Sequence, residues 1–342
     1  MKFNIRTAPG NHSFQTEAGE TLLEAALRQN IGLPYGCRNG QCGSCIATLD
    51  SGEVGYPSGK TEALQGQAVK ACLTCQAVPL TDCVLGVTEV ETTAEIEVRT
   101  LPCRVVEKEQ LNHDVIRLYL KLPESQRLQF FAGQYLEFIL RDGRKRAFSI
   151  ANAPHDDALI ELHIRHVPDG EFTDYVFDSM KDKTVLRIQA PLGTFVLREE
   201  SDRPMIFIGG GTGFAPIKGM IEHALHNGID RPMHLYWGAR SERDLYLPDL
   251  PERWAQEHAN LTYIPVLSEP DQGWTGRKGF VHEAVIEDHP DMSGFDAYLS
   301  GPPIMVESGR KAFEEHGLTM DHMFSDAFEY AAPNESKAKS GD

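Results

Sequence analysis

Four cysteines in the first quarter of the chain have a spacing that suits a redox-active metal centre. Cys37, Cys42, Cys45 and Cys75 follow the pattern C-x4-C-x2-C-x29-C. Plant-type proteins bind a [2Fe–2S] cluster through four thiolates with this spacing. Glycines around the first three cysteines let the backbone wrap closely around a cluster and aim N–H groups at its sulfur atoms. The pattern therefore predicts a centre that transfers single electrons.

The alternative for these cysteines is zinc, because C-x2-C pairs also bind that metal. Zinc sites usually combine two such pairs or add histidines, whereas here one pair faces a single distant cysteine. The thirteen histidines form no metal-binding pattern such as H-E-x-x-H. Iron–sulfur chemistry is therefore the favoured interpretation. Cys83 and Cys103 stand alone and are predicted to be buried thiols.

A glycine-rich loop, Gly209–Pro216, lies between an apolar run and a predicted helix. Glycines let a pyrophosphate approach the backbone, and the start of a helix supplies N–H groups and a partial positive charge. The pattern is Gly211-x-Gly213-x-x-Pro216, with proline where the dinucleotide fingerprint has a third glycine or an alanine. The loop therefore predicts a nicotinamide-cofactor site that departs from that fingerprint.

Three further segments could position a flavin or a nicotinamide. Arg146–Ser149 reads Arg-Ala-Phe-Ser, so a guanidinium could pair with a flavin pyrophosphate, a ring could pack on the flavin and a hydroxyl could reach its redox-active edge. Gly170–Thr173 is a loop-to-helix start suited to phosphate. Tyr298–Met305 contains Ser-Gly-Pro-Pro after a predicted strand, at the sheet edge where ligands bind. The simpler interpretation of this last segment is a strand-to-helix turn.

Three patterns along the chain indicate the elements that carry these motifs. A capping box at Thr21 and Glu24 opens a helix just before the cysteine loop, and residues 76–90 are rich in strand formers. From Leu101 to about Glu200 short strands alternate in period two, which predicts an antiparallel barrel. Strands and helices then alternate, which predicts a parallel sheet with helices on both faces. The barrel strands are expected at 115–120, 135–140, 159–166 and 185–188 with a helix at 173–180, and the sheet strands at 205–208, 233–237 and 297–299 with a helix at 217–227.

The chain therefore divides into three expected domains. Their predicted boundaries are 1–92 for the cysteine-bearing domain, 93–100 for a linker, 101–200 for the barrel, 201–331 for the α/β domain and 332–342 for a disordered tail.

Composition and charge restrict the partners and the location. The chain has 342 residues and a net charge of −17, and no uncharged apolar run reaches the length of a membrane span. The negative charge argues against nucleic acid, whose phosphates need a basic surface. An acidic surface could steer the chain toward a basic protein partner, or it could simply aid solubility. Seven cysteines and an N-terminus without an apolar signal core predict a cytoplasmic protein.

Together the three regions resemble the ferredoxin-containing NAD(P)H reductases of the ferredoxin–NADP reductase superfamily. The resemblance extends to about Ala331, and the cysteine pattern is its most specific part. It implies an α+β β-grasp domain with a plant-type [2Fe–2S] cluster, an antiparallel β-barrel flavin domain and an α/β parallel-sheet nicotinamide-binding domain. Members include reductase components of bacterial oxygenases and the reductase that serves the CDP-6-deoxyhexulose dehydrase. The segments Leu33–Gly40 and Tyr236–Arg240 are most similar to the dehydrase type.

The resemblance also implies roles for individual residues. The fourth iron ligand would be Cys75, which Gln-Ala follows as in the family, and Cys72 would be a buried thiol. Ser149 would lie close to the flavin nitrogen that accepts hydride. Ser300 stands where many relatives have a cysteine that touches the nicotinamide, and it would take over that contact. The C-terminal candidates for a place near the flavin are Phe324, Asp326 and Phe328.

The remaining cofactor contacts follow from the same resemblance. The expected flavin contacts are Arg146, Ala147, Phe148, Ser149, His163, Ile164, Gly170, Phe172 and Thr173. The expected nicotinamide contacts are Gly211, Thr212, Gly213, Pro216, Arg240, Gly301, Pro302 and Met305.

The implied activity is that of an NAD(P)H-dependent oxidoreductase. Electrons would pass from NADH to FAD, then singly to the [2Fe–2S] cluster and on to a separate acceptor protein, an oxygenase component or a dehydrase. Arg240 and Arg243 could bind a 2′-phosphate, but Glu242 and Asp244 lie among them, which favours NADH over NADPH. The alternative is a redox sensor or scaffold whose cluster regulates partner binding without sustained turnover.

Overall fold

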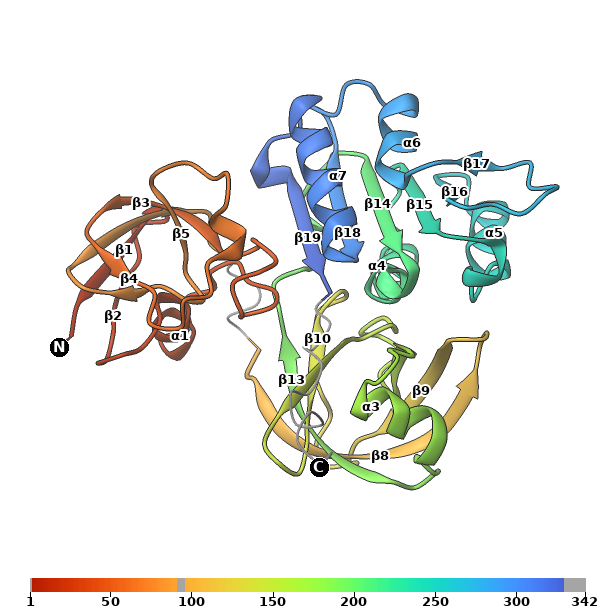
Figure 1. Ribbon diagram of the computed structural model, residues 1–342, viewed down its shortest axis with the longest axis horizontal. Coiled ribbons are helices and arrows are strands. Elements are labelled where there is room, and N and C mark those ends of the chain that lie inside the picture. Colours follow the sequence, from red (N-terminus) through yellow and green to blue (C-terminus); the bar gives the residue numbers. More distant parts are fainter. Residues whose placement is uncertain (1, 91–95, 329–342) are drawn as a thin grey trace, which may run out of the picture.

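The structure, a computed structural model, describes residues 2–90 and 96–328. It contains an N-terminal domain, a barrel domain and a C-terminal domain, coloured red to orange, yellow to green and green to blue in Figure 1. Linker residues 93–95 and the expected tail, 332–342, lie outside the described residues. The proposed domain boundaries stay predictions.

The N-terminal domain is a small sheet with one helix, as the α+β prediction requires. Its strands run in the order β2-β1-β7-β3-β5, with β1 and β7 parallel. The predicted capping box is present: the Thr21 hydroxyl accepts from the Glu24 N–H at 3.2 Å, and the Glu24 carboxylate accepts from the Thr21 N–H at 3.0 Å. The elements are β1 (Asn4–Pro9), β2 (Ser13–Gln15), α1 (Leu22–Arg28), β3 (Ile46–Ser51), β4 (Val54–Gly55), η1 (Glu62–Leu64), β5 (Ala71–Leu73), β6 (Val78–Pro79) and β7 (Cys83–Val87).

The barrel domain is a six-stranded antiparallel sheet in the order β11-β10-β13-β8-β9-β12. A bridge between Ile150 and Leu162 joins its two edges, which confirms the predicted barrel. The helix expected at 173–180 is a short α-helix that continues as a π-helix, and the Lys108 ammonium donates to three carbonyls at its end. The elements are β8 (Arg99–Gln110), β9 (Val115–Lys121), β10 (Tyr135–Ile139), β11 (Lys145–Ser149), β12 (Ile160–Arg165), α3 (Glu171–Asp174), η2 (Tyr175–Ser179) and β13 (Val185–Leu192).

The C-terminal domain is a parallel sheet in the order β17-β16-β15-β14-β18-β19, as predicted. Helices α4 and α5 cover one face and α6 and α7 the other (Figure 1). The elements are β14 (Met205–Gly210), η3 (Gly211–Gly213), α4 (Phe214–His226), β15 (Met233–Ala239), η4 (Glu242–Asp244), α5 (Asp249–Glu257), β16 (Leu261–Leu267), β17 (Arg277–Lys278), α6 (Val281–Asp288), β18 (Asp296–Gly301), α7 (Pro303–Glu315), η5 (Met320–His322) and β19 (Met323–Ala327).

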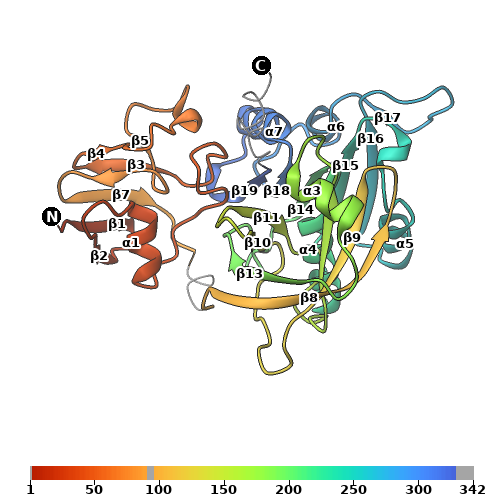
Figure 2. The ribbon, with the colours of Figure 1, turned by 60° about the horizontal axis from the view of Figure 1, so that its bottom comes forward.

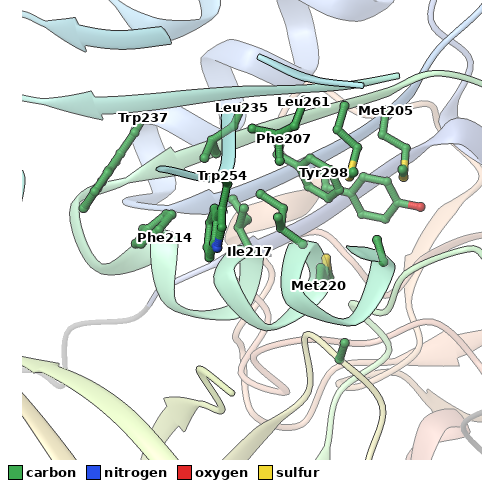
Figure 3. Close-up of a cluster of buried hydrophobic side chains, with 14 of the residues drawn as sticks. Met205, Phe207, Phe214, Ile217, Met220, Leu235, Trp237, Trp254, Leu261 and Tyr298 are labelled. Carbon is green, nitrogen blue, oxygen red and sulfur yellow. The ribbon is translucent and has the colours of Figure 1, made fainter. Parts of the chain in front are cut away.

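An apolar core fixes the start of α4, and with it the glycine loop. Figure 3 shows Phe214, Ile217 and Met220 of α4 directed toward the side chains of the sheet. The Phe214 ring stacks on Trp237 with centroids 4.1 Å apart, and both side chains are fully buried. Burial of each large side chain contributes about 1.5–3 kcal/mol to the free energy of folding, so a shift of the helix start would destabilise the domain. Among the described residues, no helix is both long and apolar enough to cross a membrane.

Candidate redox site

The four predicted iron ligands converge in the N-terminal domain as two pairs. The Sγ atoms of Cys45 and Cys75 lie 3.1 Å apart. Cys37 and Cys42 form the second pair, in which each backbone N–H donates to the other residue's sulfur at 3.4 Å. Two pairs supply two thiolates to each of two irons, whereas one zinc ion needs all four in a single tetrahedron. No group of three metal-ligating side chains suited to a single ion occurs within 2–90 and 96–328.

Hydrogen bonding within the sulfur pairs shifts the thiol pKa values in both directions: it lowers the pKa of Cys42 and Cys75, whereas the hydrogen bond with Cys75, together with burial, raises the pKa of Cys45. Hydrogen bonds from Cys37, together with those from Ser44, outweigh burial and lower the pKa of the Cys42 thiol to about 5. Burial raises the pKa of the Cys72 thiol to about 12. The Cys72 side chain shares the core of the N-terminal domain with Cys45, Cys75 and Cys83, but the printed sulfur contact joins Cys45 to Cys75, and the thiol that acts on Cys72 is Cys83. The donor set therefore fits a four-thiolate cluster that uses Cys75.

The cysteine loop is docked on the barrel domain through its own backbone (Figure 2). The N–H of Tyr35 donates to the Thr194 hydroxyl at 2.7 Å, and the Thr194 N–H donates to the Tyr35 carbonyl at 3.1 Å. The hydroxyl of Tyr135 donates to the Gly36 carbonyl at 3.0 Å. Since Tyr135 opens β10 and Thr194 follows β13, the barrel positions the loop one residue before the first ligand.

The opposite side of the loop meets the C-terminal domain. The Ser44 hydroxyl donates to the carbonyl of Ser325, in β19, at 2.9 Å. Cys42 packs within an apolar cluster that also contains Met323 and Ala327 of β19 and Val306 of α7. The cluster site therefore lies where all three domains meet.

The predicted flavin motif forms the edge strand β11. Phe148 lies against Phe138 and Phe172, with ring centroids 5.8 Å and 5.6 Å away. Ser149 ends the strand, and its hydroxyl donates to the Asp326 carboxylate at 3.3 Å. Asp326 was one of three C-terminal candidates, and both residues are only 9% exposed. Ala147 is exposed and Arg146 is half-buried, with the Arg146 guanidinium donating to the neighbouring Lys145 carbonyl.

The other predicted flavin contacts lie on the adjoining elements. Gly170 begins α3 beside Thr173, whose hydroxyl would lie 2.5 Å from any Cβ at position 170. The His163 ring is fully buried: its Nε2–H donates to Glu161 at 2.8 Å and its Nδ1 accepts from the Tyr246 hydroxyl at 2.9 Å. Ile164 is also fully buried. Contact between a flavin and either residue would therefore have to use the backbone.

The glycine loop and the Ser-Gly-Pro-Pro turn pack directly on each other. A Cβ at Gly213 would lie 2.0 Å from the Ser300 carbonyl, and one at Gly210 would lie 2.5 Å from the Met305 sulfur. Gly301 has φ +145°, where side chains are strained. Two motifs separated by about ninety positions thus form one backbone-lined cradle at the carboxyl edge of the sheet, suited to a dinucleotide. Thr212, Pro216 and Pro302 belong to the same loop ends.

Ser300 connects this cradle to the flavin motif. It pairs with Asp326 across β18 and β19, and Asp326 in turn accepts from Ser149. The Ser300 hydroxyl is fully buried and has no hydrogen-bond partner within the described part of the chain. An unpartnered buried hydroxyl is costly. A nicotinamide could satisfy it only after the groups that cover Ser300 move, because the protein itself buries this oxygen. The three side chains come from the barrel and from two strands of the C-terminal domain.

Arg165, beside the glycine loop, did not emerge from the sequence patterns. Its Nη1 would lie 2.8 Å from a Cβ at Gly211, and its Nε–H donates to Asp114 at 2.7 Å. A guanidinium in this position could pair with a pyrophosphate. In the sequence, this role is indicated only by the position of Arg165, directly after the expected flavin contacts His163 and Ile164. Arg240 is exposed at the end of β15, and Asp244 nearby caps η4 through Ser241.

Comparisons with protein-family models divide the chain as the fold does. Residues 5–80 match the 2Fe-2S iron-sulfur cluster binding domain. Residues 102–197 match the oxidoreductase FAD-binding domain, and residues 207–311 match the oxidoreductase NAD-binding domain. All three expected cofactors are therefore supported.

Individual relatives cover nearly the whole chain. The CDP-6-deoxy-L-threo-D-glycero-4-hexulose-3-dehydrase reductase of Yersinia pestis is 40% identical over 96% of this chain and 99% of its own length. The reductase component of the naphthalene 1,2-dioxygenase system of Pseudomonas putida is 33% identical over 94% and 97%. The crystal structure of an Amycolatopsis cytochrome P450 reductase matches with a TM-score of 0.76 and 34% identity, over 95% and 98%.

Proposed function

Because this chain belongs to the ferredoxin-containing NAD(P)H reductases of the ferredoxin–NADP reductase superfamily, we propose that it passes electrons from NADH through FAD and a [2Fe–2S] cluster to a separate acceptor protein. The observation that carries the proposal is the meeting of the cysteine loop, Ser149 and Ser300 around β18 and β19. Bound FAD would accept hydride from NADH and release electrons one at a time.

The chain's own residues would prepare the hydride transfer. The cradle of Gly210, Gly213 and Gly301 would hold the dinucleotide. Glycine is needed there because a Cβ on any of the three would clash with the facing loop. The Ser300 hydroxyl would hydrogen-bond the nicotinamide once the groups that cover it move. The Ser149 hydroxyl would lie beside the flavin edge and hold its proton there, oriented by its hydrogen bond to Asp326. The low exposure of this trio would exclude water from the reacting atoms.

The four cysteines would hold the cluster as two pairs, Cys37 with Cys42 and Cys45 with Cys75. A conversion of Cys42 to Ser tests this assignment in the purified protein. We expect NADH-dependent reduction of cytochrome c to be abolished, while reduction of ferricyanide, which accepts directly from flavin, persists. Equal loss of both activities would contradict the proposed division of labour.

A matched pair of variants tests the fourth ligand. Cys75→Ser should lose the visible absorption of the cluster, whereas Cys72→Ala should retain it, because the sulfur that pairs with Cys45 is that of Cys75. The reverse result would transfer the ligand role to Cys72.

The donor is proposed to be NADH. Glu242 and Asp244 beside Arg240 disfavour a 2′-phosphate, so kcat/KM with NADH should exceed that with NADPH. A strong preference for NADPH in steady-state kinetics would reverse this choice.

The acceptor is proposed to be a dehydrase of the CDP-6-deoxyhexulose type or an oxygenase component, as the names of the relatives suggest. We place this work in the cytoplasm, since the cluster needs thiolates, which a reducing compartment preserves. Sustained cytochrome c reduction would distinguish an electron-transfer enzyme from a sensor, whose cluster would be reducible without turnover.

A further inference from the structure

Arg310, on α7 of the C-terminal domain, reaches across the domain interface to the cysteine loop. Its Nη1 lies 3.5 Å from the carbonyl of Cys42. The same nitrogen would lie 2.8 Å from a Cβ at Gly43, so the guanidinium occupies the space that the glycine leaves open. Its Nη2 lies 3.8 Å from the sulfur of Met320. The guanidinium is therefore held between Met320 of η5 and the cysteine loop, in which Gly43 lies between the predicted iron ligands Cys42 and Cys45.

This cation has no carboxylate partner within ion-pair distance among residues 2–90 and 96–328. Burial lowers the pKa of Arg310, and Cys42, Glu314 and Glu307 act on it only as more distant charges. Removing a guanidinium from water is costly unless a nearby negative charge compensates it. Glu307 and Glu314 of the same helix supply part of that charge to the half-buried guanidinium. On the loop side, where its described contacts are one carbonyl and one glycine, a bound cluster would add to it.

A [2Fe–2S] cluster with four thiolates supplies such a charge. Its two ferric irons, two sulfides and four thiolates have a net negative charge, which increases when one iron is reduced to ferrous. The sulfur of Cys42 packs in the apolar cluster contributed mainly by the C-terminal domain, on the side from which Arg310 approaches. A cation in this position stabilises the reduced cluster more than the oxidised one, because net charge and hydrogen bonding set cluster potentials.

We propose that Arg310 is a positioning residue that raises the reduction potential of the cluster from a neighbouring domain. In the step that it favours, one electron leaves the flavin that NADH has reduced and converts one ferric iron to ferrous, without making or breaking a bond. The cation belongs to the C-terminal domain and the cluster to the N-terminal domain. Docking of the two therefore makes the cluster a better electron acceptor. This inference rests on the proposed function.

Redox titration of the intact holoprotein, followed by the EPR signal of the reduced cluster, tests the role of Arg310. Arg310→Gln should shift the cluster potential to a more negative value and slow cytochrome c reduction several-fold. Arg310→Lys keeps the charge and should stay closer to the unmodified protein. Lys311→Gln removes an exposed cation one position along the same helix and should leave the potential unchanged. The flavin potential should be the same in all four proteins.

Each other outcome has a definite meaning. An unchanged cluster potential in a loaded Arg310→Gln variant would overturn the inference. An equal shift in the Gln and Lys variants, or equal loss of the cluster from both, would also overturn it, because shape rather than charge would then be the cause. If the unmodified protein showed no cluster signal at all, the proposed function itself would fail.

Discussion

The barrel domain meets its two neighbours in opposite ways. The contact with the C-terminal domain is a buried ion pair. Lys218 of α4, in the C-terminal domain, donates to Glu161 of β12, in the barrel, at 3.0 Å, and to Glu222 of its own helix at 2.9 Å. Toward the N-terminal domain, Thr194 and Tyr135 hydrogen-bond only to backbone atoms of the cysteine loop. The interface with the C-terminal domain therefore depends on charged side chains, whereas the interface with the N-terminal domain depends on the backbone of the cysteine loop.

The difference follows from what each interface must achieve. Hydride transfer needs flavin and nicotinamide in contact, so the two domains that hold them benefit from a rigid junction. His163 and Tyr246 extend the charged network, and the side chains of Glu161 and Lys218 are each 7% exposed. Electron transfer to the cluster needs only a fixed distance, which a few backbone hydrogen bonds can set. The first interface should therefore dominate stability and the second should govern the rate of cluster reduction.

Replacement of Lys218 by Met should have the largest effect, because it leaves the Glu161 charge buried without its ammonium partner. Breaking a buried ion pair in this way costs about 3–5 kcal/mol. We expect that loss in the free energy of unfolding of the barrel and C-terminal domains, followed by the release of flavin during denaturant titration. Glu222→Gln is the matched control and should cost less, since burial raises the pKa of Glu222 and a neutral amide suits the site. Similar losses in both variants would refute the central role of the Lys218–Glu161 pair.

Acid should weaken the same interface through Glu161. Burial raises the pKa of this carboxyl, but the hydrogen bond from His163 and the charge and hydrogen bond of Lys218 outweigh it, so the pKa falls to about 2. A carboxyl with a lowered pKa stabilises the fold above its unfolded value, 4.5, and this contribution is lost as the pH falls toward about 2. The stability advantage of the unmodified protein over Glu161→Gln, measured by denaturation from pH 6 downward, should shrink below about pH 4.5. A constant difference across that range would contradict the assignment.

Local patterns predicted much of this molecule, because they act over a few residues. The Thr21 capping box, the alternation in β9 and β12, and the glycine loop before α4 all depend on neighbours within one turn or one strand. The strands β16 and β19 were not predicted. Their place is set by the parallel neighbours β15 and β18, not by local pattern.

The contacts that the cysteine loop makes with the other two domains could not be predicted. The bond from Tyr35 to Thr194 spans 159 positions, and that from Arg310 to Cys42 spans 268. On its helix Arg310 resembles any surface arginine in sequence. Only the folded arrangement reveals that it faces the cysteine loop.

Thr194→Val should have the smallest effect on stability and a selective effect on electron transfer. The variant leaves the Tyr35 N–H buried without its acceptor, which costs about 1–3 kcal/mol of docking energy between the N-terminal domain and the barrel. We expect slower reduction of the cluster by NADH in stopped-flow absorbance, with the preceding reduction of flavin unchanged. Thr194→Ser keeps the hydroxyl and should behave like the unmodified protein. If Val slowed flavin reduction as much as cluster reduction, the two junctions would not be separable, and the barrel would transmit strain from one to the other.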